Sequence, residues 1–227
     1  SYGKIEMEND NCPLVSIGVP VFNGEDGLAR ALDSLLGQDY SNLEIIISDN
    51  ASTDTTSEIC EKYVQKDSKV TYSHSRENLG AIMNYNRVFE LSHGKYFMLA
   101  AHDDQRELSF VSACVEKMER CSEAALCQAH TASFLEGRKE VLCVSNLDSF
   151  EGVTGLVERY RETLKYFPAV AIYGLYRLAV MRKTRMFQKL LAGDLAFIQE
   201  LSIYGEFVQV PEVLFYYFGR EKWNTVH

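Results

Sequence analysis

The chain has 227 residues, of which 46% are hydrophobic and 24% are charged, and its formal net charge is −9. This composition is ordinary for a globular protein and allows one large α/β domain, while the negative charge argues against a nucleic-acid-binding surface. No run reaches the roughly 18 apolar residues that a membrane span requires, so we expect no transmembrane segment. Six scattered cysteines, none in a C-x-x-C pair, are typical of reduced core thiols in a cytosolic protein.

The order of elements is clearest in residues 13–107, where β-rich runs alternate with segments whose apolar residues recur at helical spacing. The predicted strands are residues 14–20, 43–49, 70–75 and 96–101, each followed by a predicted helix. Helices of about ten residues or more between strands imply right-handed crossovers. The sequence therefore predicts an α/β fold with a mainly parallel sheet flanked by helices. Residues 1–12 are expected to be a flexible N-terminal segment.

The second half of the chain follows a less regular pattern. The predicted helices are residues 109–121, 154–166 and 194–204, the predicted strands are residues 124–134, 140–144, 207–210 and 213–218, and residues 169–179 are ambiguous. Because no linker divides the chain, we expect a single domain at residues 13–220. Its first half spans residues 13–107 and its second half spans residues 108–220. Residues 221–227 are expected to form a C-terminal tail.

Asp103 and Asp104 follow an uncharged, apolar predicted strand at residues 96–101. In open α/β sheets, ligands bind just beyond the carboxyl ends of the strands, where these carboxylates would lie. Two adjacent carboxylates repel each other unless a cation or a shared proton holds them. The pair is therefore interpreted either as a divalent-metal site that grips a phosphate or as a polar turn before the next helix.

Two other predicted strands also end in polar residues, and their ends belong to the same rim of the sheet. Among them, Asp49 can accept a hydrogen bond from a base or a ribose, while a metal held by the Asp103–Asp104 pair can bridge phosphates. An acidic rim repels a bare pyrophosphate, so a cation is required. The polar residues of these two strand ends are Pro20, Asn23, Glu25, Asp49, Asn50, Ser52 and Asp54.

Four motifs in this order and spacing resemble those of family 2 glycosyltransferases. They are PVFNGE at residues 20–25, SDNASTD at residues 48–54, ENLG at residues 77–80 and HDD at residues 102–104. The resemblance is specific over residues 13–107, which it implies are the nucleotide-sugar half, and looser over residues 108–220, the expected acceptor half. It implies a Rossmann-like GT-A fold, a nucleotide-diphospho-sugar donor, a divalent cation (Mn²⁺ or Mg²⁺) and inversion at the anomeric carbon.

The resemblance also implies roles for single residues. Asp49 matches the acid that contacts the base. Asp103 and Asp104 match the end of the family's DxD-type metal motif, in which Ala101 stands in place of the first acid, and His102 is a further candidate ligand. The residues predicted to bind the nucleotide sugar are Pro20, Phe22, Asn23, Glu25, Asp49, Asn50, Ser52, Asn78, Gly80, Asn84, Asp103 and Arg177.

Three candidates in the second half rest on the same resemblance. Asp194, at the start of a predicted helix, matches the family's catalytic acid and would take a proton from an acceptor hydroxyl, although an Asp there also suits an N-cap. Arg177 either neutralises phosphate or solvates the edge of an apolar segment. Arg220 stands where many relatives carry a metal-binding His, and an Arg can pair with phosphate but cannot ligate a metal.

The sequence thus predicts a metal-dependent inverting glycosyltransferase that moves one sugar to an unidentified acceptor hydroxyl in glycan or polysaccharide biosynthesis. A sugar-nucleotide-binding module without catalysis is the first alternative, favoured by Ala101 and Arg220. A nucleotidyltransferase is the second, disfavoured because residues 20–27 contain no Lys or Arg. Without a Gln-x-x-Arg-Trp motif, we expect single additions rather than polymerisation. We expect a cytoplasmic protein, with a peripheral position at the inner face of the membrane and a homodimer both left open.

Overall fold

The computed structural model of the chain describes residues 12–135, 141–165 and 169–219. The strands are β1 (Val15–Val21), β2 (Leu43–Asp49), β3 (Val70–His74), β4 (Tyr96–Leu99), β5 (Gln105–Arg106), β6 (Ala124–Leu135), β7 (Val141–Ser145), β8 (Leu175–Arg177) and β9 (Glu206–Gly219). The helices are α1 (Leu28–Leu36), α2 (Thr56–Lys66), α3 (Ala81–Glu90), α4 (Phe110–Arg120), α5 (Leu156–Lys165), α6 (Leu178–Met181) and α7 (Gly193–Tyr204).

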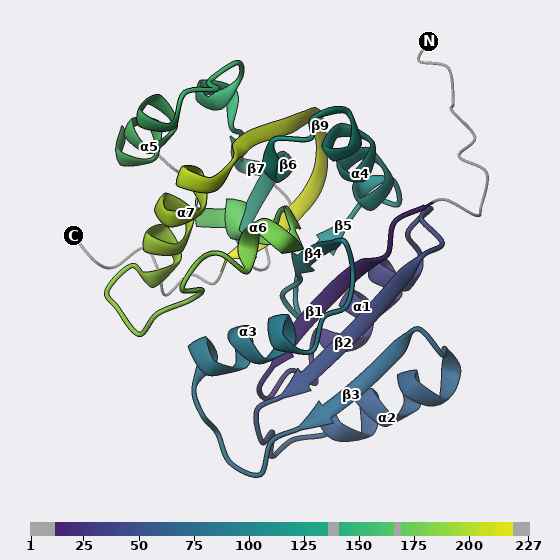
Figure 1. Cartoon of the computed structure of the whole chain (residues 1–227). Coiled ribbons are helices and arrows are strands. Elements are labelled where there is room, and N and C mark those ends of the chain that lie inside the picture. The colour runs from purple at the N-terminus through teal and green to yellow at the C-terminus, as the bar shows by residue number, and fades with distance from the viewer. Residues whose placement is uncertain (1–11, 136–140, 166–168, 220–227) are drawn as a thin grey trace.

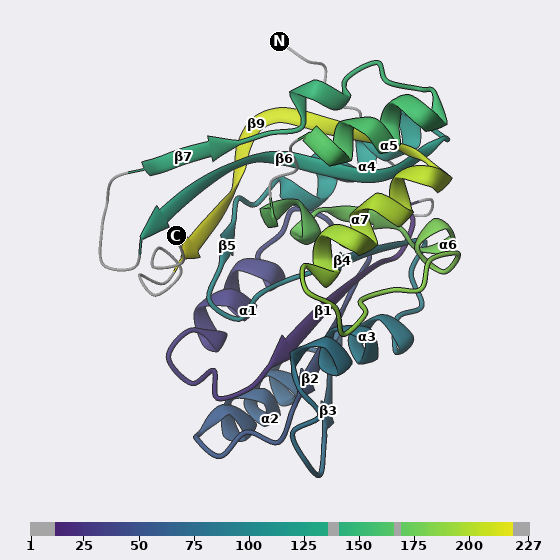
Figure 2. The same cartoon turned by 90° about the vertical axis from the view of Figure 1, so that its left-hand side faces the viewer.

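All of the described strands belong to one sheet, in the order β3-β2-β1-β4-β8-β6-β9-β5, with β7 paired to β6. The first four strands are parallel to one another, as the alternation of strands and helices predicts. The second half is mixed, because β8 is antiparallel to both β4 and β6 while β6 and β9 are parallel. Figures 1 and 2 show this curled sheet with helices on both of its faces. The α/β prediction is confirmed, and the mixed part refines it.

The helices divide the core into two clusters, one on each face of the sheet. Adjacent strand residues point to opposite faces, so Tyr96 and Met98 pack with α1, α2 and α4. Phe97 and Leu99 of the same strand pack with α3, α6 and α7. Strands that are apolar on both faces are typical of a sheet covered by helices on each side. This double burial explains why the predicted strand at residues 96–101 lacks polar alternation.

Two predictions for the second half are corrected. The predicted strands at residues 207–210 and 213–218 are one strand, β9, whose pairing with β6 shifts register near His130. This irregularity accommodates Pro211, which interrupts the strand pattern in the sequence without ending the strand. The ambiguous residues 169–179 form a 3₁₀ segment (Ala169–Tyr173), β8 and the start of α6.

Some predictions lie partly or wholly outside the described residues. These are the flexible segment at residues 1–12, of which only Cys12 is described, the tail at residues 221–227, and Arg220. None of the described helices combines the length and apolar character needed to cross a bilayer. All six cysteines are free thiols, of which Cys60, Cys114 and Cys127 are buried and Cys143 is exposed, so only part of the set belongs to the core.

Candidate active site

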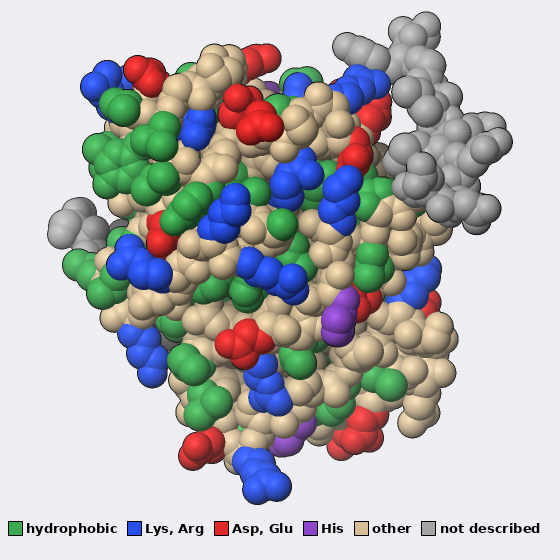
Figure 3. Space-filling view, in the orientation of Figure 1, with side chains coloured by type: hydrophobic (Ala, Val, Ile, Leu, Met, Phe, Trp, Pro, Cys, Tyr) green, Lys and Arg blue, Asp and Glu red, His purple; other side chains and the backbone are tan. Residues whose placement is uncertain are grey.

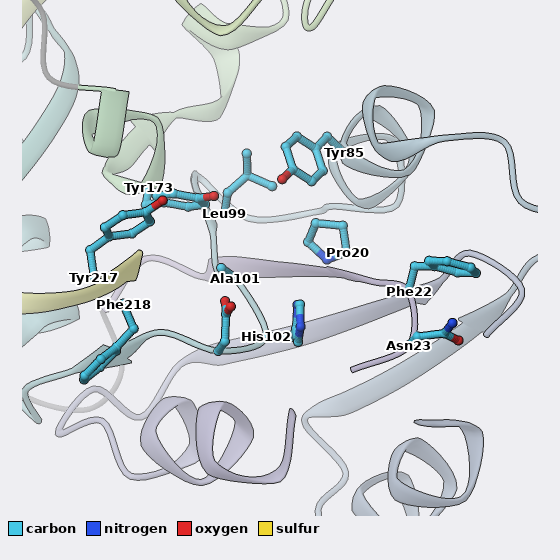
Figure 4. A pocket seen from close by; sticks show the side chains of 11 residues that line it. Pro20, Phe22, Asn23, Tyr85, Leu99, Ala101, His102, Tyr173, Tyr217 and Phe218 are labelled. Atoms are coloured by element: carbon cyan, nitrogen blue, oxygen red, sulfur yellow. The ribbon is translucent and has the colours of Figure 1, made fainter. Parts of the chain in front are cut away.

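A pocket of about 470 Å³ opens at the carboxyl ends of β1 and β4. Figure 4 shows Tyr85, Phe22 and Asn23 at one end of it and Tyr217 and Phe218 at the other, with His102 between them. The lining residues come from the β1 and β4 strand ends, α3, the 3₁₀ segment and β9. They are Pro20, Phe22, Asn23, Tyr85, Leu99, Ala101, His102, Asp103, Tyr173, Tyr217 and Phe218. Four predicted donor-binding residues therefore line this pocket: Pro20, Phe22, Asn23 and Asp103.

Hydrogen bonds join the loop that follows β1 to the loop that follows β2. The backbone N–H of Asn23 donates to Ser52 Oγ (2.9 Å), and Asn23 Oδ1 accepts from the Thr53 N–H (2.8 Å). The backbone of Asn23 is left-handed, with φ of 50°, a conformation that Asn tolerates better than most residues. The Glu25 carboxylate accepts from the N–H and hydroxyl of Thr55. Glu25 and Ser52 thus hold the loop that carries Phe22 and Asn23.

Asp49 lies at the end of β2, with no exposed surface. Its carboxylate accepts hydrogen bonds from the Ser52 N–H (2.9 Å) and the Tyr72 hydroxyl (2.9 Å), and Nδ1 of His74 lies 3.0 Å away. Burial by itself raises the pKa of this carboxyl, but the hydrogen bonds from Ser52, His74 and Tyr72 outweigh burial and lower the pKa below its usual value. Asp49 is therefore ionised and hydrogen-bonded to neighbouring protein groups, and it lies behind the pocket rather than in its lining.

The third motif, ENLG at residues 77–80, is held in place by hydrogen bonds to the side-chain amide of Asn50, which follows β2. Asn50 donates to Asn78 Oδ1 (2.8 Å) and accepts from the Leu79 N–H (2.9 Å). Gly80 has φ of +86°, a conformation that side chains strain, and directly precedes α3. Asn84 is buried in α3. Its Oδ1 accepts from Ser48 Oγ, and its Nδ2 donates to the backbone oxygens of Ser48 and Val21. Asn50, Asn78 and Asn84, all predicted to bind the donor, thus direct their side-chain polar groups toward other groups of the protein.

Asp103 and Asp104 have different environments. Asp103 lines the pocket, and its backbone oxygen accepts from Arg30 (3.1 Å). Asp104 is 1% exposed, and its Oδ1 accepts from the Phe218 N–H (3.1 Å). Burial is the main cause that raises the pKa of Asp104 to about 7, against the attraction of Arg106. The neighbouring carboxylate of Asp103 raises it further.

The surroundings of the acid pair bear on whether it can hold a divalent cation. Among the described residues, no group of three or more His, Cys, Asp or Glu side chains converges on one point. However, Oδ2 of Asp104 is buried and has no hydrogen-bond partner, which is costly unless a cation or a proton occupies that side. Mn²⁺ and Mg²⁺ sites in nucleotide enzymes often use one or two carboxylates and complete their coordination with substrate phosphates. The pair fits a cation of that kind.

Asp194 lies in the first turn of α7, one residue inside the helix, so it is not the N-cap. Its Oδ1 accepts from the adjacent Leu195 N–H. Burial is the largest cause that raises the pKa of the Tyr85 hydroxyl, and the charges of Asp103, Asp104 and Asp194 raise it further. All three acids are thus within electrostatic reach of one pocket-lining hydroxyl. Asp194 therefore influences the same hydroxyl as the acid pair, although it comes from the other half of the chain and does not line the pocket.

Arg177 does not belong to this region, which corrects its predicted role in donor binding. Register places it opposite Tyr96, at the beginning of β4, whereas the pocket lies at the other end of that strand. Its guanidinium donates to the backbone oxygens of Met118, Cys121 and Ala124. Arg177 closes the carboxyl end of α4, a location that favours a cation.

Sequence reasoning missed the aromatic wall of the pocket. Tyr85, Tyr173, Tyr217 and Phe218 are not among the predicted site residues, because aromatic residues in apolar runs are core residues by default. A hydrogen bond links the hydroxyls of Tyr85 and Tyr173. Only a hydroxyl on an otherwise apolar segment could have drawn attention to these residues. Glycines also contribute, because a Cβ at Gly24 or Gly27 would lie within 3 Å of His102.

Comparisons with known proteins agree with the motifs. The sequence profile of glycosyl transferase family 2 matches residues 16–180. Glycosyltransferase GlyA of Streptococcus pneumoniae is 28% identical over 182 residues, which are 78% of this chain and 25% of GlyA. WcaA of Escherichia coli, whose name refers to colanic acid biosynthesis, is 39% identical over 97 residues, which are 42% of this chain and 34% of WcaA. The chain thus spans about a quarter to a third of the length of these curated relatives.

Solved structures match over a larger share of the chain. TarS 1-349 of S. aureus, in complex with UDP-GlcNAc, has a TM-score of 0.74 at 21% identity and covers 92% of this chain and 59% of its own. Mannosyltransferase PcManGT of Pyrobaculum calidifontis, in complex with GDP-Man and Mn²⁺, has a TM-score of 0.68 at 17% identity and covers 91% and 57%. These similarities confirm the predicted GT-A fold. Because the family profile matches most of its length, the chain belongs to glycosyl transferase family 2.

Proposed function

We propose that the chain is the catalytic domain of a metal-dependent, inverting glycosyltransferase that moves one sugar from a nucleotide-diphospho-sugar to an acceptor hydroxyl. The observation that carries the proposal is the placement of Asp103 in the pocket beyond β1 and β4, next to Asp104, whose buried Oδ2 has no hydrogen-bond partner. Ligands of open α/β sheets bind at this edge. Because relatives such as WcaA are named for polysaccharide biosynthesis, we assign the reaction to glycan or polysaccharide synthesis.

The donor is proposed to lie across the carboxyl ends of β1 and β4. Pro20, Phe22 and Asn23 form the end of the pocket suited to the nucleoside, since a half-exposed ring and an amide offer stacking and hydrogen bonding. Asp49, buried behind this lining, is proposed to support the nucleoside end by holding Ser52 in place. The remaining motif residues shape the loops around the donor: Glu25, Asn50, Ser52, Asn78, Gly80 and Asn84.

The divalent cation is proposed to be held by Asp103 and Asp104 together with the donor diphosphate. Support comes from the unpartnered, buried oxygen of Asp104 and from the Mn²⁺ in the complex of PcManGT. When bound, such a cation neutralises the charge that develops on the departing nucleoside diphosphate. Without it, a −9 chain with acids in this pocket would repel that group.

Asp194 is proposed as the general base. As the acceptor oxygen forms its bond to the anomeric carbon, the carboxylate of Asp194 takes the hydroxyl proton. The bond between that carbon and the diphosphate oxygen breaks, and the electron pair leaves with the nucleoside diphosphate. Attack from the face opposite the leaving group inverts the anomeric carbon. Asp194 belongs to α7 and the acid pair follows β4, so the proposed base and the proposed leaving-group site come from separate elements.

The proposal is tested by measuring nucleoside diphosphate release from UDP- and GDP-sugars with Mn²⁺, with and without a chelator. Asp103→Asn should lower turnover about 100-fold or more. Asp39→Asn is the matched control, because Asp39 is an exposed acid in the loop after α1, and it should retain turnover within about twofold. Full turnover of Asp103→Asn, or in chelator, would reject the metal role.

A second candidate is a sugar-nucleotide-binding module without catalysis. It is favoured by the absence of a three-ligand metal cluster among residues 12–135, 141–165 and 169–219. Calorimetric titration with UDP and Mn²⁺, followed by a turnover assay across an acceptor panel, separates the two. Binding without turnover identifies a module. The expected cytoplasmic location and a homodimer stay predictions.

A further inference from the structure

Helix α5 is packed by its polar residues and exposes its apolar ones. Arg159 and Thr163 are its buried side chains. Arg159 donates to the backbone oxygens of Ser202 (2.8 Å) and Ile203 at the carboxyl end of α7. Four unpaired carbonyls end every α-helix, and a cation there is stabilising. The packing of α5 on α7 therefore depends on Arg159 rather than on an apolar stripe.

The apolar stripe of α5 faces outward as a result. Successive members are one, three and four residues apart, which places all four within an arc of about 100° on one side of the helix. They are Leu156, Val157, Tyr160 and Leu164, with exposures of 49%, 57%, 39% and 59%. A single exposed leucine needs no explanation, but a continuous stripe of large apolar side chains marks an interaction site.

Neighbouring elements continue this surface. Leu190 and Leu191, in the loop between α6 and α7, are 63% and 102% exposed. Ile203 and Tyr204, at the end of α7 where Arg159 binds, are also exposed. Figures 1 and 2 show α5, α7 and this loop side by side on one side of the molecule. We call the set Leu156, Val157, Tyr160, Leu164, Leu190, Leu191, Ile203 and Tyr204 the α5–α7 surface.

Basic residues surround the α5–α7 surface, although the chain as a whole is acidic. Residues 156–191 hold eight of the 23 Lys and Arg but only two of the 32 Asp and Glu. Six of these basic residues are exposed: Arg161, Lys165, Arg182, Lys183, Arg185 and Lys189. Figure 3 shows hydrophobic side chains over α5 with Lys and Arg side chains beside and below them. Two of the six pair with acids, Lys165 with Glu162 and Arg185 with Glu200, and the positive charge of the others favours a negatively charged partner.

We infer that the α5–α7 surface docks on an anionic lipid bilayer. Leucines and a tyrosine on one side of a helix, flanked by Lys and Arg, are the composition of helices that lie in the headgroup region. Basic residues near an anionic leaflet each add to binding. A second copy of the chain is disfavoured, because a two-fold contact uses the same patch of both copies and would bring two basic rims into one interface. The inference is independent of the proposed reaction.

The test is flotation of the whole chain with vesicles. Binding is expected to vesicles in which roughly a quarter of the lipids are phosphatidylglycerol, to weaken at about 0.5 M NaCl, and to be absent with phosphatidylcholine alone. Leu156→Ser/Leu164→Ser should lower the bound fraction about fivefold or more. Leu191→Ser, at a fully exposed position that cannot disturb the core, should lower it in the same direction.

The matched control is Lys62→Glu/Val64→Ser on α2, which packs against the other face of the sheet. It should bind as the unaltered chain does. The assignment to lipid is overturned by no binding to anionic vesicles, by equal binding of the leucine variants, or by a dimer in sedimentation velocity that the leucine variants abolish. Calorimetric donor titration of the same variants keeps a failure of docking separate from a failure of the proposed function.

Discussion

The backbone N–H of Phe218 donates a 3.1 Å hydrogen bond to Oδ1 of Asp104, which joins residues 114 positions apart. Phe218 and its neighbour Tyr217 line the pocket from β9, while Asp104 belongs to the acid pair after β4. The bond thus connects the two halves of the chain at the candidate active site. It also occupies one carboxylate oxygen of Asp104 and leaves the other without a partner.

Asp104 is expected to make stability depend on pH. Its pKa of about 7 in the folded chain lies above the unfolded value of 3.8, so the unfolded state releases its proton first as pH rises. The free energy of unfolding should therefore fall with rising pH, by about 2 kcal/mol between about pH 5 and pH 7. Asp104→Asn should remove this fall. Urea denaturation of both chains at the two pH values measures the difference, and parallel profiles would contradict the prediction.

Asp194→Asn should lower sugar transfer about 100-fold or more, because it removes the proposed proton acceptor. Donor affinity, measured by calorimetry, should stay within about twofold. The control is Glu58→Gln, since Glu58 is likewise an acid in the first turn of a helix. Both changes should cost about 0.3–1 kcal/mol of stability through the helix dipole. Equal transfer by both variants would leave Asp194 a purely structural role.

Arg177→Ala should lower the free energy of unfolding by about 2 kcal/mol, because three backbone oxygens lose a charged donor. Arg177→Lys should restore part of this loss, since an ammonium cannot reach all three acceptors at once. Donor affinity should be the same in both variants and in the unaltered chain. If the variants bound the donor more weakly but kept their thermal stability, the prediction would be wrong and Arg177 would be a donor-binding residue.

Asn84→Ala should cost about 1–3 kcal/mol of stability, because buried Ser48 Oγ loses its acceptor and two backbone oxygens lose a donor. A double-mutant cycle with Ser48→Ala should give a coupling energy of about 0.5 kcal/mol or more. Denaturant unfolding of the four chains measures it. Additive effects of the two changes would show that Asn84 acts independently of Ser48.

Much of the first half was predictable because its signals are local. A strand buried on both faces reads as an apolar run, as in β4, and the helix that follows each strand shows its own spacing. The motifs were predictable for the same reason, since each lies at the end of one strand. What these motif residues do was less predictable. Asp49 and Asn84 are oriented inward, because side chains far along the chain supply their hydrogen-bond partners.

The sequence by itself determined the α/β class, the parallel direction of the first four strands and the position of the acid pair after β4. Neighbouring residues encode both the periodicity of an element and the chemistry at the end of a strand. Only the tertiary structure decided that Tyr173, Tyr217 and Phe218 close the pocket and that Arg177 stays away from it. It also decided that α5 turns its apolar stripe outward. Those positions depend on hydrogen bonds to carbonyls and carboxylates that are distant in the sequence and become neighbours only in the folded sheet. The spacing of residues along the chain does not reveal such partners.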